Sequence, residues 1–481
     1  MSRGQRPTVS LPHQVAGTRF LRENERAALF DEQGLGKSKQ LIDAVAADVT
    51  NGTLGGALIV CPNGLKTNWA EEVEGFSTLP YAVFGSGRKA RRVAFRCLRA
   101  AFYVINYEAV HAELASLRQL LRFKPMALVL DESHRIKTPD SKVTRAVLQL
   151  RTEAQRRYIL TGTPVANKPE DLWSQAFFLD DGMALGNTFE AFQRRYCTGG
   201  GYQSVDELRE RVMQLALRRT KEESLELPPK QFHRVSVELT GRQRALYEQM
   251  RDELAVWVRS LSGEEVQTHG DLIFTRMLRL AQIASNPALI DAGYDQLPAK
   301  FAALDELLAA YTPQRKVIVW SSFVGNIQAL AARYPHLKPV TIYGELDTAA
   351  RDHAVRAFRG DSGVRLLVAN PAAAREGLTL TEANVAIYVD RTFNLVDYLQ
   401  SQDRIHRISQ TRECDIVLLV AAQTIDEFID FALAQKHRLA RFTQKDADLI
   451  DPDDLALRKP DILRALLTPQ QPRQADPHSG G

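Results

Sequence analysis

Short runs of apolar residues alternate along the chain with segments in which apolar positions recur at helical spacing. In the first half, runs typical of buried strands occur at Ala27–Phe30, Ala57–Cys61, Phe102–Ile105, Ala127–Leu130 and Tyr158–Leu160. In the second half, such runs occur at Val317–Trp320, Val340–Tyr343, Leu366–Ala369, Val385–Val389 and Ile416–Val420. Because strands that alternate with helices build parallel sheets covered by helices, the pattern predicts an α/β fold with two doubly wound lobes.

The segment between the two halves has a different pattern. Residues Thr240 to Ser285 are charged, helical in period and poor in Gly and Pro, and Leu227-Pro228-Pro229-Lys230 interrupts the chain before them. We therefore expect a first lobe over residues 1–235, a helical insert or linker over 236–295 and a second lobe over 296–445. Residues 446–481 are expected to form a tail, which from about Asp451 is rich in Pro, Gln and Asp and therefore frayed apart from one short helical turn at Ile462–Leu467.

A glycine-rich segment, Asp31-Glu32-Gln33-Gly34-Leu35-Gly36-Lys37-Ser38, follows the first apolar run and precedes a helical pattern. Strand, glycine loop and helix in this order are typical of a phosphate-binding loop. Gly34 and Gly36 allow backbone N–H groups to surround phosphates, while Lys37 neutralises their oxygens. The Ser38 hydroxyl suits Mg²⁺, so Gly34, Leu35, Gly36, Lys37 and Ser38 are predicted nucleotide contacts. Asp31 occupies the position where the general signature has glycine.

An acidic box, Asp131-Glu132-Ser133-His134, follows the apolar run that ends at Leu130. Open α/β sheets bind ligands at the carboxyl ends of their strands, so Asp131 is predicted to hold Mg²⁺ and Glu132 to deprotonate the attacking water. If the box stood alone, an acidic turn after a strand would be the better interpretation. Because a phosphate loop precedes it in the sequence, we favour the catalytic interpretation. His134 has no Cys or His neighbours at metal-ligand spacing, so we expect it to form hydrogen bonds across the active cleft and couple the lobes.

Basic residues gather in two places. Arg404 and Arg407 lie three positions apart in Gln400–Gln410, hence on one face if that segment is helical. Arginine can stabilise charge on a transferring phosphoryl group, which a pair on the second lobe could do only when the lobes close. A surface helix with solvated arginines is the competing interpretation. The basic segment Gly87–Arg99 also has two interpretations: contact with nucleic acid, or a solvated helix face.

Composition narrows the class of protein without identifying its partner. The 481 residues are 44% hydrophobic, and 62 basic against 58 acidic side chains give a net charge of +4, which leaves nucleic acid possible. No apolar segment approaches a membrane span and the first ten residues lack a signal-peptide core, so a soluble, cytoplasmic protein without membrane contact is expected. The cysteines lack any Cys-x-x-Cys pair, which indicates neither zinc nor a disulfide framework: Cys61, Cys97, Cys197 and Cys414.

Taken together, the motifs resemble those of the SNF2-type ATPases of helicase superfamily 2. The phosphate loop is similar to the family's Asp-Glu-x-Gly-Leu-Gly-Lys-Thr, which accounts for Asp31. Further ordered matches cover most of the chain: Leu11-Pro12-His13-Gln14 with Gly17, Val60–Asn63 with Trp69, Val104–Glu108, Leu160–Pro164 with Asn167, Leu217–Lys221, Ala281–Leu289, Lys316–Phe323 and Gln400–Gln410. The family's Gly-Gly-x-Gly-x-Asn-Leu is replaced here by Ala374–Leu380.

The resemblance implies an ATPase with two RecA-like lobes and helical insertions between them, which uses ATP with Mg²⁺ to step along duplex DNA. It assigns base contact to Gln14, and it makes Arg404 and Arg407 arginine fingers. The residues that it assigns to coupling are Thr161, Gly162, Thr163 and Gly377; those that it assigns to DNA contact are Asn63, Tyr107 and Thr379. With no appended reader or nuclease module evident, a minimal motor is expected.

Two alternatives stay open at this point. A strand-separating DNA or RNA helicase of the same superfamily would share these motifs. A scaffold that binds ATP and nucleic acid as a switch, within a larger DNA-processing complex, would not need a general base and arginine fingers, so Glu132, Arg404 and Arg407 argue against it.

Overall fold

The structure is a computed structural model that describes residues 9–447, except 86, 97–98, 166–167, 199–200, 262–264, 266–267 and 375–377. Within these limits the chain divides into two compact units. The N-terminal lobe comprises residues up to 227 together with Leu378 and residues from 436, and the C-terminal lobe comprises the rest. Gly377, Asn167 and the Ile462–Leu467 turn lie outside the described residues.

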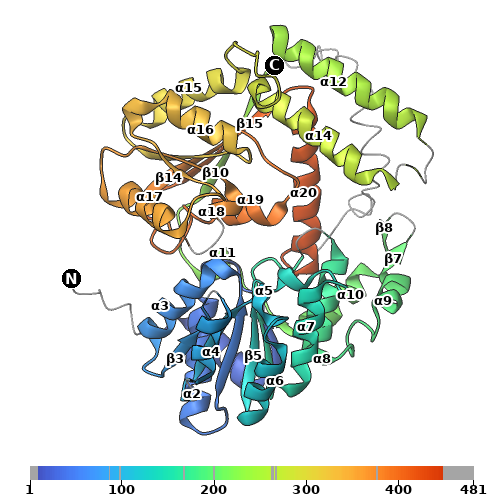
Figure 1. Cartoon of the computed structure of the whole chain (residues 1–481), viewed down its shortest axis with the longest axis vertical. Coiled ribbons are helices and arrows are strands. Elements are labelled where there is room, and N and C mark those ends of the chain that lie inside the picture. Colours follow the sequence, from blue (N-terminus) through green and yellow to red (C-terminus); the bar gives the residue numbers. More distant parts are fainter. Residues whose placement is uncertain are drawn as a thin grey trace, which may run out of the picture. The chain divides into compact units, whose positions relative to one another are not determined.

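The N-terminal lobe is built on a parallel sheet of seven described strands, in the order β3-β4-β2-β5-β6-β1-β9 (Figure 1). The strands are β1 Arg26–Leu29, β2 Gly56–Cys61, β3 Tyr81–Val83, β4 Phe102–Asn106, β5 Met126–Asp131, β6 Arg156–Leu160 and β9 Ala216–Leu217. The helices are α1 Pro12–Glu23, α2 Lys37–Thr50, α3 Lys66–Phe76, α4 Arg88–Arg96, α5 Tyr107–Val110, α6 Leu114–Phe123, α7 Lys142–Leu150, α8 Trp173–Asp180, α9 Phe189–Tyr196, α10 Val205–Met213 and α11 Lys221–Ser224. A small antiparallel hairpin joins β7 Cys197–Thr198 to β8 Gly201–Tyr202.

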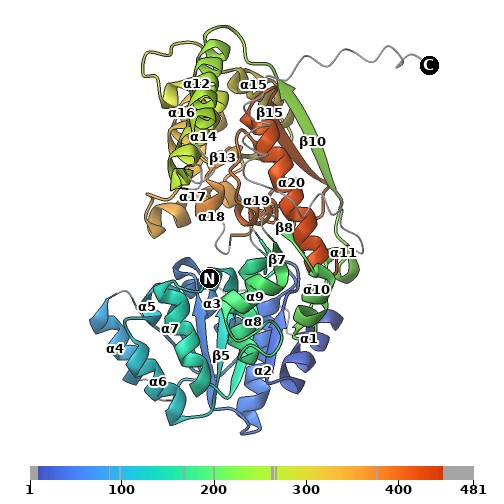
Figure 2. The ribbon, with the colours of Figure 1, turned by 90° about the vertical axis from the view of Figure 1, so that its right-hand side faces the viewer.

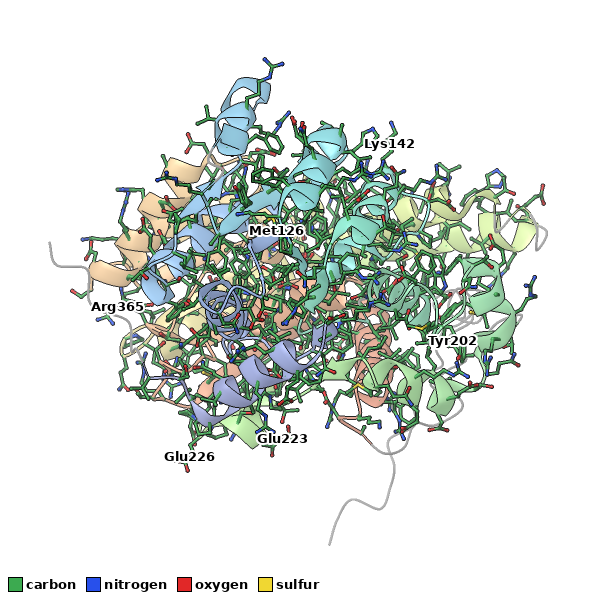
Figure 3. All side chains as sticks on the ribbon, turned by 90° about the horizontal axis from the view of Figure 1, so that it is seen from below. Met126, Lys142, Tyr202, Glu223, Glu226 and Arg365 are labelled. Carbon is green, nitrogen blue, oxygen red and sulfur yellow. The ribbon has the colours of Figure 1, made fainter. Side chains whose placement is uncertain are left out.

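The central strands of this lobe are buried on both faces, as their continuous apolar runs predict. Every residue of β5 from Met126 to Leu130 is fully buried, and β2 has the same pattern. Figure 3 shows the difference between interior and rim: Met126 lies inside the lobe, whereas Lys142 at the start of α7 and Glu226 lie at its edge. A rigid sheet of this kind holds its strand ends in fixed positions.

The C-terminal lobe has a second parallel sheet, with six described strands in the order β10-β15-β14-β11-β13-β12. The strands are β10 Lys230–Val237, β11 Lys316–Trp320, β12 Val340–Ile342, β13 Leu366–Ala369, β14 Ala383–Tyr388 and β15 Cys414–Ala421. The helices are α12 Gly241–Ser260, α14 Gly270–Ser285, α15 Ala299–Tyr311, α16 Val324–Arg333, α17 Thr348–Gly360, α18 Pro371–Ala374 and α19 Leu395–Gln402. Helix α20 Ile425–Thr443 begins in this lobe, and its residues from 436 belong to the N-terminal lobe. The predicted α/β class with two parallel-sheet lobes and helical insertions is confirmed.

Strand β10, which the hydrophobic pattern does not predict, forms the edge of the second sheet (Figure 2). Most of its side chains are exposed, including Phe232 at 56%. An edge strand pairs on one side only, so it lacks the buried apolar run by which the central strands are recognised. Among the described helices, none is both long and apolar enough to cross a membrane.

Candidate nucleotide-binding site

Three neighbouring strands of the N-terminal lobe bring separate motifs to one edge of the sheet. Strand β6 pairs with β1 on one side and with β5 on the other, all in parallel. The phosphate loop follows β1, Thr161 follows β6 and Asp131 ends β5. Because parallel strands share the same carboxyl edge, these segments, which are distant in the sequence, meet where such sheets bind ligands.

The phosphate loop has the backbone conformation that its glycines allow. Gly34 and Gly36 have φ angles of 90° and 76°, in the left-handed region that favours glycine, and Gly36 caps the N-terminus of α2. The first N–H groups of a helix lack helical partners and attract anions. Lys37 Nζ donates to the carbonyl oxygens of Asp31 at 2.7 Å and Glu32 at 3.3 Å. Burial lowers the pKa of Lys37, while the charges of Glu132 and Asp31 act to raise it.

The acidic box combines a supported carboxylate with a close second one. Trp69 Nε1 donates to Asp131 Oδ2 at 2.8 Å, and the Tyr107 hydroxyl donates to the Asp131 carbonyl oxygen at 2.8 Å. Burial, followed by repulsion from Glu132, raises the pKa of Asp131 to about 7. Two adjacent carboxylates in a buried setting suit a divalent cation, which would remove the repulsion. Asp131 therefore fits a Mg²⁺ ligand.

Glu132 and His134 lie close together. Glu132 has a φ of 51°, a backbone conformation that non-glycine residues rarely adopt and that functional sites often contain. His134 Nδ1 is 3.4 Å from Glu132 Oε2, so within this lobe the histidine lies beside the predicted base. Ser133 is fully buried, and its hydroxyl donates to Gln175 Oε1 at 2.5 Å. The coupling role predicted for His134 stays a prediction.

The segment after β6 packs directly on the phosphate loop. The Thr161 N–H donates to the carbonyl oxygen of Leu29 in β1 at 3.1 Å, and the Thr163 N–H donates to Thr161 Oγ1 at 3.2 Å. A Cβ at Gly162 would lie only 2.9 Å from Cγ of Gln33, so glycine permits this close approach. Gln33 is 8% exposed, and neither its amide nitrogen nor its amide oxygen has a described partner. Sequence reasoning did not single out Gln33.

The segment predicted to contact the base also lies on the loop. Gln14 Oε1 accepts a hydrogen bond from the Leu11 N–H at 3.1 Å. A Cβ at Gly36 would lie 2.5 Å from Gln14 Nε2, which places this carboxamide against the phosphate loop. The neighbouring His13 Nε2 donates to the carbonyl oxygen of Leu35 at 3.0 Å. Gln14 thus adjoins the predicted phosphate contacts.

Arg404 and Arg407 belong to the C-terminal lobe and do not lie on a helix. Helix α19 ends at Gln402, so the helical condition for one shared face is not met: Arg404 lies in the turn that follows and Arg407 in a bend. Arg404 is 2% exposed and its Nε donates to the Gln400 carbonyl oxygen at 2.8 Å. Arg407 Nη1 donates to Thr379 Oγ1 at 2.9 Å, which places two predicted site residues in contact.

The residues predicted to contact DNA are placed differently from one another. Asn63 is exposed at the start of a short 3-10 helix after β2. Tyr107 is 1% exposed, and its hydroxyl supports Asp131 as described above. In the basic helix α4, Arg91 forms an ion pair with Glu113 at 2.7 Å, so this arginine serves its own lobe. No described residues gather three or more His, Cys, Asp or Glu side chains as a metal site would.

Comparison with known proteins gives a consistent family. The model of the SNF2-related domain matches residues 13–289, and that of the helicase conserved C-terminal domain matches residues 299–409. An uncharacterized ATP-dependent helicase of Mycoplasma pneumoniae is 27% identical over 436 residues, which cover 89% of this chain and 41% of that protein. A putative ATP-dependent helicase/translocase of Bacillus subtilis is 29% identical over 441 residues, which cover 87% of this chain and 47% of that protein.

A human DNA annealing helicase and endonuclease is 27% identical over 458 residues, which cover 90% of this chain and 40% of that protein. The chain thus spans less than half the length of these curated relatives. Among solved structures, the SWI2/SNF2 ATPase core of Sulfolobus solfataricus in complex with dsDNA is 26% identical, with 95% of this chain and 100% of that chain covered and a TM-score of 0.43. Since the SNF2-related model alone spans more than half of the sequence, this chain belongs to the SNF2-related family of helicase-type ATPases.

Proposed function

We propose that this protein is an ATP-dependent DNA translocase, which couples ATP hydrolysis to movement along duplex DNA. The observation that carries the proposal is the meeting of the phosphate loop, Thr161 and Asp131-Glu132 at the carboxyl edge of three adjacent strands. A phosphate cradle and an acidic pair at one edge are the parts that NTP hydrolysis requires. The family of the chain supports the choice of ATP.

In this proposal the phosphate loop binds the β- and γ-phosphates of ATP. The N–H groups at the start of α2 donate to phosphate oxygens, and Lys37 neutralises their charge. Lys37 would exchange its bonds to the carbonyl oxygens of Asp31 and Glu32 for bonds to phosphate. Gln14, whose carboxamide lies against Gly36, binds the adenine base.

Ser38 and Asp131 would hold Mg²⁺, which when bound neutralises charge on the phosphate oxygens. Glu132 accepts the proton of the attacking water, and His134 Nδ1 lies 3.4 Å from its Oε2. Arg404 and Arg407 stabilise charge on the transferring phosphoryl group. Thr161, Gly162 and Thr163, which pack on the loop, transmit the state of the nucleotide, and Gly377 shares this role.

DNA is the proposed track because the human relative is named a DNA annealing helicase, and movement is proposed because the Bacillus subtilis relative is named a helicase/translocase. The choice of duplex DNA rests on the resemblance of the motifs to those of SNF2-type ATPases. Asn63 and Thr379 are proposed backbone contacts, since Asn63 is exposed and Thr379 is only partly buried. For Tyr107 we now favour a supporting role beneath Asp131, because a side chain 1% exposed offers no surface to DNA.

The proposal is tested by steady-state ATP hydrolysis without nucleic acid and with single-stranded DNA, duplex DNA or duplex RNA. Glu132→Gln serves as the control for contaminating ATPases, because it keeps the size of the side chain and removes the base. We expect duplex DNA to stimulate hydrolysis most strongly and the variant to lose this activity.

A preference for single-stranded DNA or for RNA would contradict the duplex track and favour a strand-separating helicase. Absence of hydrolysis under all four conditions, with ATP binding retained, would instead favour a nucleotide-switched scaffold. Both outcomes would overturn the translocase proposal.

A further inference from the structure

The carboxylate of Asp31, at the start of the phosphate loop, is fully buried and held by an arginine far along the chain. Arg219 Nε donates to Asp31 Oδ1 at 3.0 Å and its Nη2 donates to Oδ2 at 2.5 Å. Gln40 Nε2 adds a third hydrogen bond, to Oδ2 at 3.1 Å. A buried charge is stable only when it is paired and hydrogen-bonded, and a two-pronged arginine bond fixes geometry as well as charge.

The remaining donors of Arg219 bind two further segments. Its Nη1 donates to the carbonyl oxygen of His13 in α1, and its Nη2 also donates to Oε1 of Gln40 in α2 at 2.9 Å. One guanidinium group therefore joins α1, the phosphate loop and α2. Lysine could not reproduce this arrangement, because its donors do not form a planar fork.

The backbone around Arg219 runs along the loop as well. The Glu32 N–H donates to the carbonyl oxygen of Arg219 at 2.9 Å, and the Lys221 N–H donates to Glu32 Oε2 at 2.8 Å. Arg218 Nη1 donates to the carbonyl oxygen of Phe30 at 2.5 Å. Residues 218–221 thus pack along the phosphate loop. Of these residues, Arg219 has the side chain that also contacts α1.

Gly17 explains how α1 comes so close. A Cβ at this position would lie 1.7 Å from Oε1 of Gln40 and 2.7 Å from Nη2 of Arg219. Any other residue at position 17 would have to displace the Gln40 carboxamide and the Arg219 guanidinium, or move α1 away from them. On the same helix, Gln14 lies against Gly36 and His13 donates to the carbonyl oxygen of Leu35. The position of Gln14 relative to the loop therefore depends on contacts centred on Arg219.

We propose that Arg219 is a positioning residue for the nucleotide: by clamping Asp31, Gln40 and α1 together, it fixes the spacing between the base-binding Gln14 and the phosphate loop. This inference rests on the proposed binding of ATP by Gln14 and the loop. A fixed spacing allows the site to bind base and phosphates at once without reorganisation, which increases affinity and selectivity for the base. Loss of the clamp should weaken nucleotide binding even where the fold survives.

The test is equilibrium binding of ADP and GDP to the full chain with Mg²⁺, by calorimetry and without DNA. For Arg219→Lys we expect the Kd for ADP to rise about tenfold or more, as loss of charge-assisted hydrogen bonds predicts, and the preference for ADP over GDP to shrink. Arg157→Lys is the matched control, because Arg157 forms a two-pronged bond with Asp181 in the same lobe, from Nη1 to Oδ1 at 2.9 Å and from Nη2 to Oδ2 at 2.7 Å, and neither residue belongs to α1, α2 or the phosphate loop. Its Kd should stay at the wild-type value, although its melting temperature falls.

Gly17→Ala provides a second variant that changes no charge, in case Arg219→Lys does not fold. A folded Arg219→Lys or Gly17→Ala protein with wild-type Kd and base preference would overturn the positioning role. Equal losses of affinity in Arg219→Lys and Arg157→Lys would also overturn it, because they would indicate general loosening of the lobe. Failure of the wild-type chain to bind ADP would overturn the proposed function itself, before any variant is compared.

Discussion

Two aspartates at the carboxyl ends of buried strands, one in each lobe, have opposite surroundings. Asp390 in the C-terminal lobe, just after β14, is 3% exposed and its carboxylate accepts four hydrogen bonds. The donors are Ser285 Oγ at 3.0 Å, Ser321 Oγ at 2.6 Å, the Ser322 N–H at 2.6 Å and Asn326 Nδ2 at 3.1 Å. Asp131 in the N-terminal lobe receives a hydrogen bond from Trp69 but lies beside a second carboxylate, which helps to raise its pKa to about 7.

The difference separates a structural carboxylate from one that is suited to a ligand. Asp390 has enough donors for its charge within its own lobe, and they tie the end of α14 to β11 and α16. Asp131 keeps unfavourable charge that a bound cation would relieve. Position at the carboxyl end of a strand is therefore not sufficient to identify a site; the balance of donors and charges around the carboxylate decides.

The largest expected effect comes from Glu132, the neighbour that makes Asp131 different. Glu132→Gln should lower kcat for ATP hydrolysis by at least about a hundredfold, because a general base contributes roughly 10²–10⁴ to the rate. Binding of ADP should persist. The checks are steady-state hydrolysis and calorimetric titration; a kcat near that of the wild type would remove Glu132 from the role of base.

At Asp390 we expect a large loss of stability without a change in nucleotide binding. Asp390→Ala leaves two serine hydroxyls and the Ser322 N–H without this acceptor, while Asn326 Nδ2 keeps only its bond to Ser285 Oγ. Each buried donor left unsatisfied costs about 1–3 kcal/mol. The measurement is urea denaturation followed by circular dichroism. If Asp390→Ala bound ADP more weakly under conditions in which the variant is fully folded, Asp390 would not be merely structural.

Asp131→Asn tests whether the charge of Asp131 destabilises the folded protein, because the effect of this charge on stability depends on pH. The pKa of Asp131 in the folded protein, about 7, exceeds the unfolded value of about 3.9. The folded state therefore binds more protons than the unfolded state between these values, and stability falls as pH rises from about 4 to about 7. Without nucleotide, Asp131→Asn should melt about 3 °C or more above the wild type at pH 8, where the wild-type charge is fully present.

Thermal denaturation at pH 8, 6 and 4 checks this prediction. The difference in melting temperature between Asp131→Asn and the wild type should shrink as the pH falls and vanish near pH 4. A constant difference across the series would show that the ionisation of Asp131 is not its cause. Addition of ADP with Mg²⁺ at pH 8 should stabilise the wild type more than the variant.

The smallest effect is expected for Tyr107→Phe, which removes the hydroxyl that donates to the Asp131 carbonyl oxygen. One neutral hydrogen bond contributes about 1 kcal/mol, so melting temperature and kcat should fall slightly while the DNA concentration for half-maximal stimulation stays unchanged. Titration of ATP hydrolysis with duplex DNA measures this. A marked increase in the DNA required would restore Tyr107 as a DNA contact.

Much of the fold follows from pattern because the central strands are buried on both faces. Runs such as Ala57–Cys61 and Leu366–Ala369 can be recognised without partners, whereas β10, with its exposed side chains, cannot. The phosphate loop and acidic box are likewise local motifs, and sheet order alone places them at one edge.

The contacts that support the site depend on residues far apart in the sequence. Arg219 lies 188 positions from Asp31, and Trp69 lies 62 positions from Asp131. The sequence contains a motif around each residue but no signal of which donor meets which carboxylate. The end of α19 before Arg404 and Arg407 could not be predicted from their spacing, because a three-residue interval places two side chains on one face only if the segment is helical.

The central claim is that ATP hydrolysis in this chain drives movement along intact duplex DNA. Displacement of a third strand from a DNA triplex, measured beside the unwinding of a forked duplex, tests it most directly. The account predicts ATP-dependent release of the third strand by the wild type, no release by Glu132→Gln, and no separation of the duplex strands. Duplex-stimulated hydrolysis without any release of the third strand would contradict translocation.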